Sequence, residues 1–170
     1  MGARSMRMRK ALSGIAAAIL MACSPQAGAD TAVAASETQD AATTHPVSGL
    51  EVVPLTVTSG DTVHRFRAEV ADTPEAQTRG LMFRTELGPD EAMIFPRDDL
   101  RPARFWMKNT PIPLDIIFIG PDGRIANIAA MTTPYSLDGV ESEGAVSAIL
   151  EIAGGRAAEL GIASGDAVAW

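Results

Sequence analysis

The N-terminal segment of this chain has the character of a targeting sequence, so the folded domain must be formed by the residues that follow it. Residues 1–29 contain four basic residues, at positions 4, 7, 9 and 10, and no acidic one. An apolar stretch from Ala11 to Ala22 follows, and the segment ends at Ala27-Gly28-Ala29. A basic region, a short apolar region and small residues at a cleavage point are typical of a secretory signal peptide. The apolar stretch is too short to span a membrane, which needs about 20 helical residues. We therefore expect residues 1–29 to be a signal peptide.

The same segment allows a second cleavage point. Leu20-Met21-Ala22-Cys23 resembles the lipobox of bacterial lipoproteins, in which the cysteine is lipidated and becomes the new N-terminus. Cys23 is the one cysteine of the chain and has no disulfide partner. Two expectations stay open. Cleavage after Ala29 gives a periplasmic protein, and lipidation of Cys23 holds it at the extracytoplasmic face of a membrane.

Composition predicts a tether and excludes some partners. Residues 30–49 are rich in Ala, Thr and Ser and are expected to form a flexible tether before a single domain over residues 50–170. Without residues 1–29, the chain has 10 Lys+Arg against 21 Asp+Glu, a formal charge of −11. Such a charge opposes phosphate backbones, so we expect no nucleic-acid partner and no membrane contact beyond an anchor on Cys23.

Missing residue types restrict the chemistry of the domain. No cysteine follows Cys23, which excludes thiol nucleophiles and cysteine-ligated metals. The two histidines, His45 and His64, precede Phe66, so a Ser-His-Asp triad or a histidine-rich zinc site is not expected. We predict no cofactor and no metal.

Short β-prone segments and two helix signals predict the fold class. Thr73-Pro74-Glu75 is typical of a helix start, with an N-cap residue, Pro at the first position and an early acid, and Gly161 is typical of a helix end. Pro121-Asp122-Gly123-Arg124 predicts a turn between antiparallel strands. We expect an α+β, mainly antiparallel β domain of seven to eight strands and two short helices, a compact curled or barrel-like sheet. The predicted strands are Leu55–Thr58, Phe66–Val70, Ala92–Phe95, Arg104–Lys108, Leu114–Ile119, Ile125–Met131, Val146–Ile152 and Ala167–Ala169.

Several specific motifs follow one another along this domain. They are Arg79-Gly80-Leu81-Met82, Met93-Ile94-Phe95, Phe105-Trp106-Met107-Lys108-Asn109-Thr110, Ile112-Pro113-Leu114-Asp115-Ile116-Ile117-Phe118, Leu150-Glu151-Ile152, Gly154-Gly155 and Gly165-Asp166. Together they resemble the domain of unknown function 192 family over about Phe66 to Val168. The resemblance implies a small β-rich domain, often exported in bacteria, with no established activity.

The segment around Trp106 is the predicted ligand site. In a strand, Arg104, Trp106 and Lys108 share one face, and a tryptophan between two cations can stack on a sugar ring or hold an anion. The alternative is that the two basic side chains only cover an indole at the surface of the sheet. Asn109 and Asp115 complete the predicted ligand-binding set.

Two carboxylates within apolar strands are the candidate catalytic residues. Alternation places Asp115 on the face of Ile117 and Ile119, where it needs a partner such as Lys108, Arg79 or backbone amides. Glu151 likewise lies on the face of Ile149. The two could form an acid/base pair assisted by Lys108 and Arg79, or each could be a structural ion pair.

These features rank three functions. The preferred prediction is a non-enzymatic accessory domain of the envelope that binds a small molecule, a glycan or an envelope protein through the Trp106–Asp115 region. The alternative is a hydrolase or lyase that uses Asp115 or Glu151. The weakest is a Cu(I) carrier using methionine thioethers, from the set Met82, Met93, Met107 and Met131.

Overall fold

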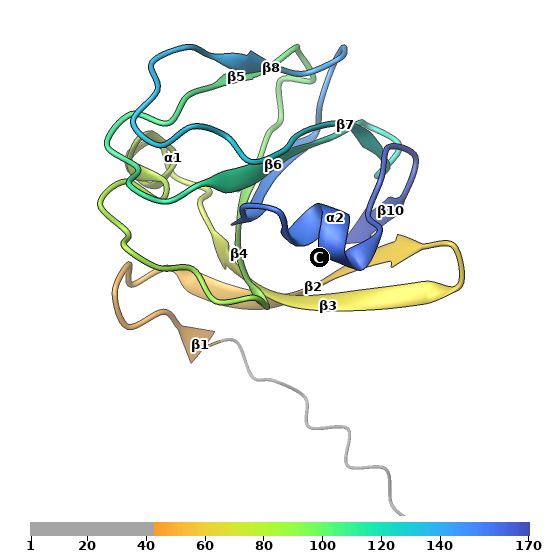
Figure 1. The fold of residues 1–170 in the computed structure, drawn as a ribbon, viewed down its shortest axis with the longest axis horizontal. Helices are drawn as coiled ribbons and strands as arrows, with labels where there is room; N and C mark the ends of the chain where they lie inside the picture. Colours follow the sequence, from red (N-terminus) through yellow and green to blue (C-terminus); the bar gives the residue numbers. More distant parts are fainter. Residues whose placement is uncertain (1–42) are drawn as a thin grey trace, which may run out of the picture. The chain divides into compact units, whose positions relative to one another are not determined.

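The computed structural model describes residues 43–170 (Figure 1), so the predicted signal peptide and Cys23 lie outside the described residues. Within the described part, no helix has the length and apolar character that a membrane crossing requires. The elements, in chain order, are β1 (Thr43–Thr44), β2 (Glu51–Ser59), β3 (Thr62–Val70), α1 (Pro74–Arg79), β4 (Glu91–Pro96), β5 (Arg104–Phe105), β6 (Leu114–Ile119), β7 (Ile125–Ala129), β8 (Val140–Glu141), β9 (Ala148–Ala153), α2 (Arg156–Leu160) and β10 (Ala167–Ala169).

The main sheet curls into a nearly closed barrel. Its strand order is β1-β2-β3-β4-β9-β6-β7, and β10 pairs with β2. The β3–β4 pair is parallel and the other pairs are antiparallel. A bridge between Arg124 and Ala167, with the Ile125 amide donating to the Asp166 carbonyl at 2.9 Å, brings β10 to the start of β7 and nearly closes the ring. The predicted fold class is confirmed.

Apolar residues form two clusters, one on each face of the strands β4, β9 and β6. The first cluster fills the barrel with side chains such as Leu150 and Ile152 and includes Ala157 of α2. The second lies outside the barrel and includes Ile149 and Phe118. Because both faces are covered, every residue of β6 is buried. A carboxylate in these central strands is therefore desolvated whichever way it points.

Both helices begin and end as their sequences predict. Thr73 is the N-cap of α1, where its hydroxyl accepts a hydrogen bond from the Ala76 amide at 3.1 Å, and Pro74 occupies the first turn. Helix α2 ends at Gly161, whose left-handed backbone lets its amide donate to the last carbonyls of the helix. In Figure 1, α2 lies within the outline of the ring, consistent with Ala157 in the interior cluster.

Several boundaries differ from the sequence prediction: β2 and β3 begin earlier, β7 ends at Ala129, β9 begins at Ala148, and β1 and β8 were not predicted. The predicted strand 104–108 ends at Phe105, and the chain then turns, with Asn109 in a left-handed backbone (φ 57°) and the Thr110 amide donating to the Met107 carbonyl at 3.1 Å. The short strand β5 pairs with β8, which was not predicted, and the two form a separate ribbon beyond β6 and β7 (Figure 1). Residues 43–49, assigned to the tether from composition, contain β1, which pairs with the first residues of β2.

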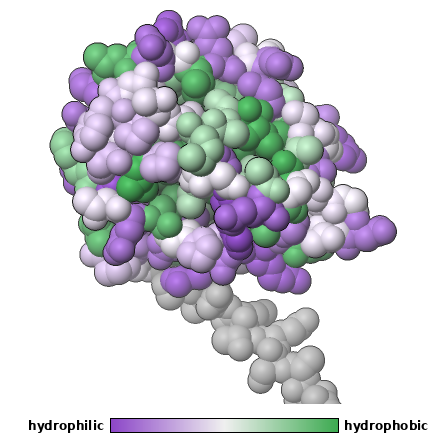
Figure 2. Space-filling view, in the orientation of Figure 1, coloured by the Kyte–Doolittle hydropathy of each residue, from purple (hydrophilic) through white to green (hydrophobic). Residues whose placement is uncertain are grey.

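Apolar side chains also reach the surface of the domain. The face in Figure 2 carries several separate apolar areas among polar residues. The large apolar side chains that are exposed are Val47, Val63, Phe83, Leu100, Trp106, Met131, Tyr135, Leu137 and Trp170. Scattered exposure of this kind is ordinary for a folded protein, so Trp106 gains meaning only from its surroundings.

Candidate functional site

Glu151 occupies the centre of the sheet and points out of the barrel. In β9 it pairs with Met93 of β4 on one side and with Ile116 of β6 on the other. Alternation places it on the face of Ile149, which belongs to the outer cluster. Its carboxyl group therefore enters the layer between the sheet and the segments that cover it.

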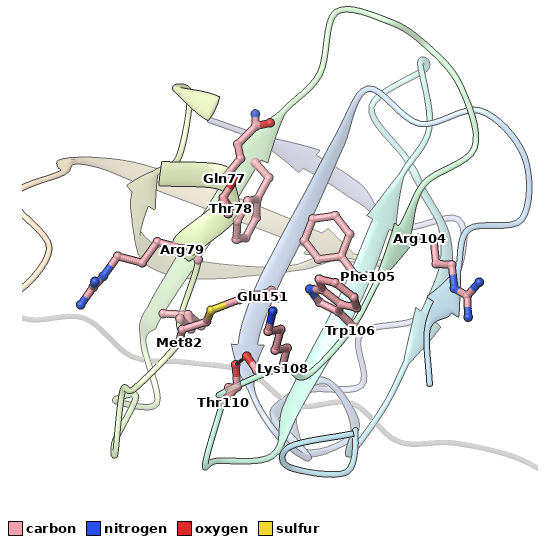
Figure 3. A pocket seen from close by; sticks show the side chains of 13 residues that line it. Gln77, Thr78, Arg79, Met82, Arg104, Phe105, Trp106, Lys108, Thr110 and Glu151 are labelled. Carbon is pink, nitrogen blue, oxygen red and sulfur yellow. Dashed lines mark hydrogen bonds between the residues drawn. The ribbon is translucent and has the colours of Figure 1, made fainter. Parts of the chain in front are cut away.

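A pocket of about 270 Å³ opens above this carboxyl group (Figure 3). One wall comes from α1 and the turn after it, and the other from β5 and residues 106–110. In Figure 3, the Met82 sulfur and the Lys108 amine point toward the centre of the view, whereas Arg79 and Arg104 extend to opposite sides. The lining residues are Gln77, Thr78, Arg79, Gly80, Leu81, Met82, Phe95, Arg104, Phe105, Trp106, Lys108, Thr110 and Glu151.

The Glu151 carboxyl has no partner within the described part of the chain. The residue is 5% exposed, yet it neither accepts a hydrogen bond nor forms an ion pair with any residue of 43–170. Burial raises the pKa of Glu151 to about 8, because desolvation disfavours the charged form. At neutral pH the group is mostly a neutral acid, which can donate a hydrogen bond into the pocket.

A tight turn after β5 presents Trp106 and Lys108 to the same pocket. The indole is 53% exposed, and the Lys108 Nζ lies 5.4 Å from its ring centroid. The turn is held from two sides: the Met107 amide donates to the Ser136 carbonyl at 3.0 Å, and the Phe83 amide donates to the Asn109 carbonyl at 2.8 Å. The Lys108 amine therefore lies over the Trp106 ring although strand β5 ends before both residues.

The other two cations at the pocket are held less tightly. The Arg79 guanidinium lies over the Phe83 ring at 6.0 Å from its centroid. Arg104 faces Glu141 at 3.7 Å with both side chains largely exposed, so their attraction is weak. Arg104 also lies against Gly139, where an added Cβ would come within 1.9 Å of its Nε. Only a glycine at 139 permits this path of the arginine.

Asp115 lies on the opposite face of the sheet from Glu151. Asp115 pairs with Ile152, one register position away from Glu151, and points into the barrel with the interior cluster. Its carboxylate accepts hydrogen bonds from three backbone amides: Met131 at 2.8 Å, Gly155 at 2.9 Å and Ala157 at 2.8 Å. Of the partners expected from sequence, the backbone amides are the ones observed.

The structure therefore does not bring the two candidate carboxylates together. Asp115 lines none of the pockets at the Trp106 segment and acts as a cap for the N-terminus of α2. An acid/base pair of Asp115 and Glu151 is excluded by their positions on opposite faces. The alternation of each strand was visible in the sequence, but the register that makes them neighbours was not.

Asn109, which belongs to the predicted ligand-binding set, also does not reach the pocket. Its side-chain amide contacts the Met82 sulfur at 3.7 Å, and it does not line the pocket. The methionines have dissimilar settings. Met93 and Met107 are buried in the outer cluster, where the Met107 sulfur accepts a hydrogen bond from the Thr132 hydroxyl, and Met131 is 57% exposed. These settings favour packing roles for Met93 and Met107 over metal ligation.

Several residues of the pocket were missed from sequence. The α1 residues Gln77 and Thr78, together with Phe95 and Thr110, line it although they lie in three separate segments. No local pattern marks them, because α1 reaches the pocket only through the parallel β3–β4 crossover. The family motifs that contain Met82 and Trp106 are the signal that could have suggested a common site.

Fold and pocket together define a class: a small, nearly closed and mostly antiparallel barrel with an unpaired acid at the floor of an outer pocket. The model of the domain of unknown function 192 family (DUF192, "Uncharacterized ACR") matches residues 55–170, so the chain belongs to this family and the predicted membership is confirmed. Among curated proteins, none matches the chain.

Two solved structures are similar to this protein. A protein of unknown function from Novosphingobium aromaticivorans DSM 12444 is 54% identical, with a TM-score of 0.76, over 78% of this chain and 94% of that chain. A candidate transcription regulator from Sinorhizobium meliloti 1021 is 33% identical, with a TM-score of 0.66, over 68% of this chain and 91% of that chain. The family is uncharacterised, so the function has to be argued from the pocket.

Proposed function

We propose that this protein is an exported accessory domain of the bacterial envelope that binds a small molecule, without catalysis, in the pocket above Glu151. One observation carries the proposal: a buried carboxyl group without a partner among residues 43–170, at the floor of an open pocket beside an exposed tryptophan. Pockets that bind small molecules combine apolar walls with a few polar groups that fix orientation, and this one has both.

The energetics of Glu151 support a ligand. The Glu151 oxygens are not among the enclosed polar atoms that lack a partner within residues 43–170, so they are open to the pocket. A ligand that accepts a hydrogen bond from this acid meets a donor that the fold already holds in place. Trp106 offers a broad apolar surface to the same ligand at little entropic cost, since its turn is already held in place.

Export is the second part of the proposal. It is supported by the basic and apolar character of residues 1–29 and by the lipobox-like sequence that ends at Cys23. The intact mass of the mature N-terminus distinguishes cleavage after Ala29 from lipidation. Substituting Cys23→Ser should release the protein from the membrane fraction only if Cys23 carries the anchor. A protein that stays in the cytoplasm with residues 1–29 attached would overturn this part.

A thermal-shift experiment tests the binding proposal. Protein purified from cells that express the full chain is screened against sugars, organic acids and cell-wall fragments. A ligand at a hundredfold excess over its Kd should stabilise the protein by about 2.7 kcal/mol. The variant Trp106→Ala should abolish the shift. Trp170→Ala is the matched control, because Trp170 is similarly exposed (47%) and does not line the pocket. Absence of any Trp106-dependent shift would contradict the proposal.

A second candidate is an enzyme in which Glu151 alone is the acid, in a hydrolase or lyase. Its raised pKa of about 8 favours this, because a general acid that is protonated at neutral pH suits proton donation to a leaving group. Lys108 would then bind the substrate, and Asp115 takes no part. Glu151→Gln should abolish turnover of nitrophenyl esters or glycosides under this alternative. A bound ligand recovered unchanged after long incubation favours the binding module.

A further inference from the structure

The charge around the pocket is opposite to that of the domain as a whole. Residues 43–170 carry 10 Lys+Arg and 18 Asp+Glu, an acidic excess. Three of these cations, Arg79, Arg104 and Lys108, line the pocket, and Glu151 is the one acidic residue that does. Burial keeps that acid mostly neutral at pH 7. The pocket is therefore a positive site on an acidic surface.

Four of the seven other arginines of the described region lie beside a carboxylate. Arg84, Arg97, Arg101 and Arg156 each have a carboxylate oxygen within 3.2 Å. In contrast, neither Arg79 nor Lys108 forms an ion pair with a carboxylate of residues 43–170, and the pairing of Arg104 is long and exposed. The positive charge at the pocket is thus available to a ligand, and an anion is the ligand that it complements.

We propose that the ligand is an organic acid with a ring, whose ring lies against Trp106 and whose carboxylate binds between Lys108 and the Glu151 carboxyl. The inference rests on the proposed binding function and names its ligand class. Glu151 donates its proton in a hydrogen bond to the carboxylate of the ligand, a charge-assisted bond of the strong kind. Lys108 supplies the countercharge. No bond is made or broken, and the shared proton stays in the pocket.

The groups that face Glu151 give this arrangement a defined pH dependence. The charged residues that line the same pocket are cations from three segments, Arg79 from α1, Arg104 from β5 and Lys108 from the turn, and none forms an ion pair with Glu151. On the neighbouring strands β4 and β6 it pairs with apolar residues, Met93 and Ile116. Ionised Glu151 would repel a carboxylate, so binding needs the protonated form. The affinity should stay constant below about pH 7 and fall tenfold per pH unit well above pH 8.

Calorimetric titration with matched probes tests the ligand class. D-glucuronate is compared with D-glucose, and 4-hydroxybenzoate with 4-hydroxybenzamide, so that the two arms distinguish an acidic sugar from an aromatic acid. At pH 6, at least one acid should bind ten times more tightly than its neutral partner. Lys108→Met should remove that preference, whereas Arg65→Met, which changes an exposed cation outside the pocket, should not.

The Glu151→Gln variant tests the role of the acid. Glutamine keeps a hydrogen-bond donor without titrating, so the affinity of this variant for D-glucuronate should be independent of pH from 6 to 9. Glu75→Gln, an exposed change on α1 outside the pocket, should keep the dependence of the native protein. Melting temperatures at pH 6 confirm that both variants are folded.

The outcomes distinguish failure of the organic-acid ligand from failure of the proposed binding function. Equal affinity for acids and neutral partners, or a native affinity unchanged from pH 6 to 9, overturns the organic acid. If D-glucose or the benzamide still binds and Trp106→Ala removes that binding, the proposed binding function is retained and only the organic acid is rejected as its ligand. If no acid, no neutral partner and no compound of the wider screen binds, the proposed function itself fails.

Discussion

Asp115 and Glu151 are neighbours in the register of β6 and β9, yet the two faces of the sheet treat them differently. Asp115 points into the barrel and accepts hydrogen bonds from three backbone amides, at 2.8–2.9 Å. Glu151 points outward and has no partner among residues 43–170, and burial raises its pKa to about 8. Both side chains are almost completely buried.

The difference separates a structural carboxylate from a candidate functional one. Asp115 satisfies amides at the N-terminus of α2 and in the loop after β7, so it joins segments that no strand pairing connects. Glu151 pairs with no residue of the described region, and burial imposes a desolvation cost on its charged form. A cost of this kind at the floor of an open pocket is typical of a site kept for a ligand or a reaction.

The largest effect is expected for Asp115→Ala. The change leaves three amide donors without their acceptor in a buried region, and we expect a loss of about 4 kcal/mol in the free energy of unfolding. Denaturant unfolding measures it, with Asp115→Asn as an intermediate case that retains one oxygen. A loss below 1 kcal/mol would mean that water replaces the carboxylate, and the contrast with Glu151 would disappear.

A pH dependence of stability is the next largest effect. In the unfolded chain Glu151 loses its proton near the ordinary value of 4.5, whereas in the folded chain it keeps it to about pH 8. The folded state therefore binds more protons between these values, and stability falls as pH rises through this window, by about 1.4 kcal/mol per unit. We expect a loss of about 3 kcal/mol from pH 5 to pH 7 through this group.

Glu151→Gln isolates that contribution. The variant should unfold at a higher denaturant concentration than the native protein at pH 8 and at a similar one at pH 4.5. Measurements with Glu75→Gln, an exposed acid, correct for the titration of surface groups. If the native protein and Glu151→Gln show the same pH dependence, the carboxyl group has a partner in solution, and both the contrast with Asp115 and the proposed ligand site lose their basis.

A third buried carboxylate, Glu69, offers an intermediate case. It is 2% exposed and accepts hydrogen bonds from the Arg84 guanidinium at 2.9 Å and from the Ser48 hydroxyl. Arg84→Ala should lower the free energy of unfolding by about 2 kcal/mol. The Glu69 carboxylate would keep its hydrogen bond from Ser48 but lose the arginine that balances its charge. Arg97→Ala, which removes a surface pair, should cost less than 1 kcal/mol in the same unfolding experiment. Equal costs would show that burial of Glu69 is incomplete.

The sequence predicts the helices and strands of this fold better than it predicts which strands pair with one another. Periodicity and turn residues identify most strands and both helices, because those signals are local. They also assign Asp115 and Glu151 to definite faces of their own strands. The pairing of β9 with β4 and β6 is not local, so the opposite orientation of the two carboxylates within one sheet could not be derived.

The same limit applies to the candidate site. Trp106 and Lys108 were identified because they lie two residues apart in one motif, and they contact each other in the structure. Gln77 and Phe95 reach the pocket from other elements, and nothing near them in the sequence indicates it. Asn109 was included by proximity in sequence and lies outside the pocket, since the turn directs its side chain to Met82.

The smallest expected effect concerns Trp106. Its indole is 53% exposed and lies at the rim of the pocket, so Trp106→Ala should change the free energy of unfolding by no more than about 0.5 kcal/mol without ligand. Phe105→Ala is the comparison, because that ring packs edge-on against Phe95 at 5.1 Å and Phe118 at 6.5 Å. Its loss should cost about 3 kcal/mol. If the two substitutions differ this much in their cost in unfolding free energy, Trp106, like Glu151, is a residue that the stability of the fold does not require. Comparable costs would instead make Trp106 part of the packing, and the pocket would lose the surface on which the proposed ring lies.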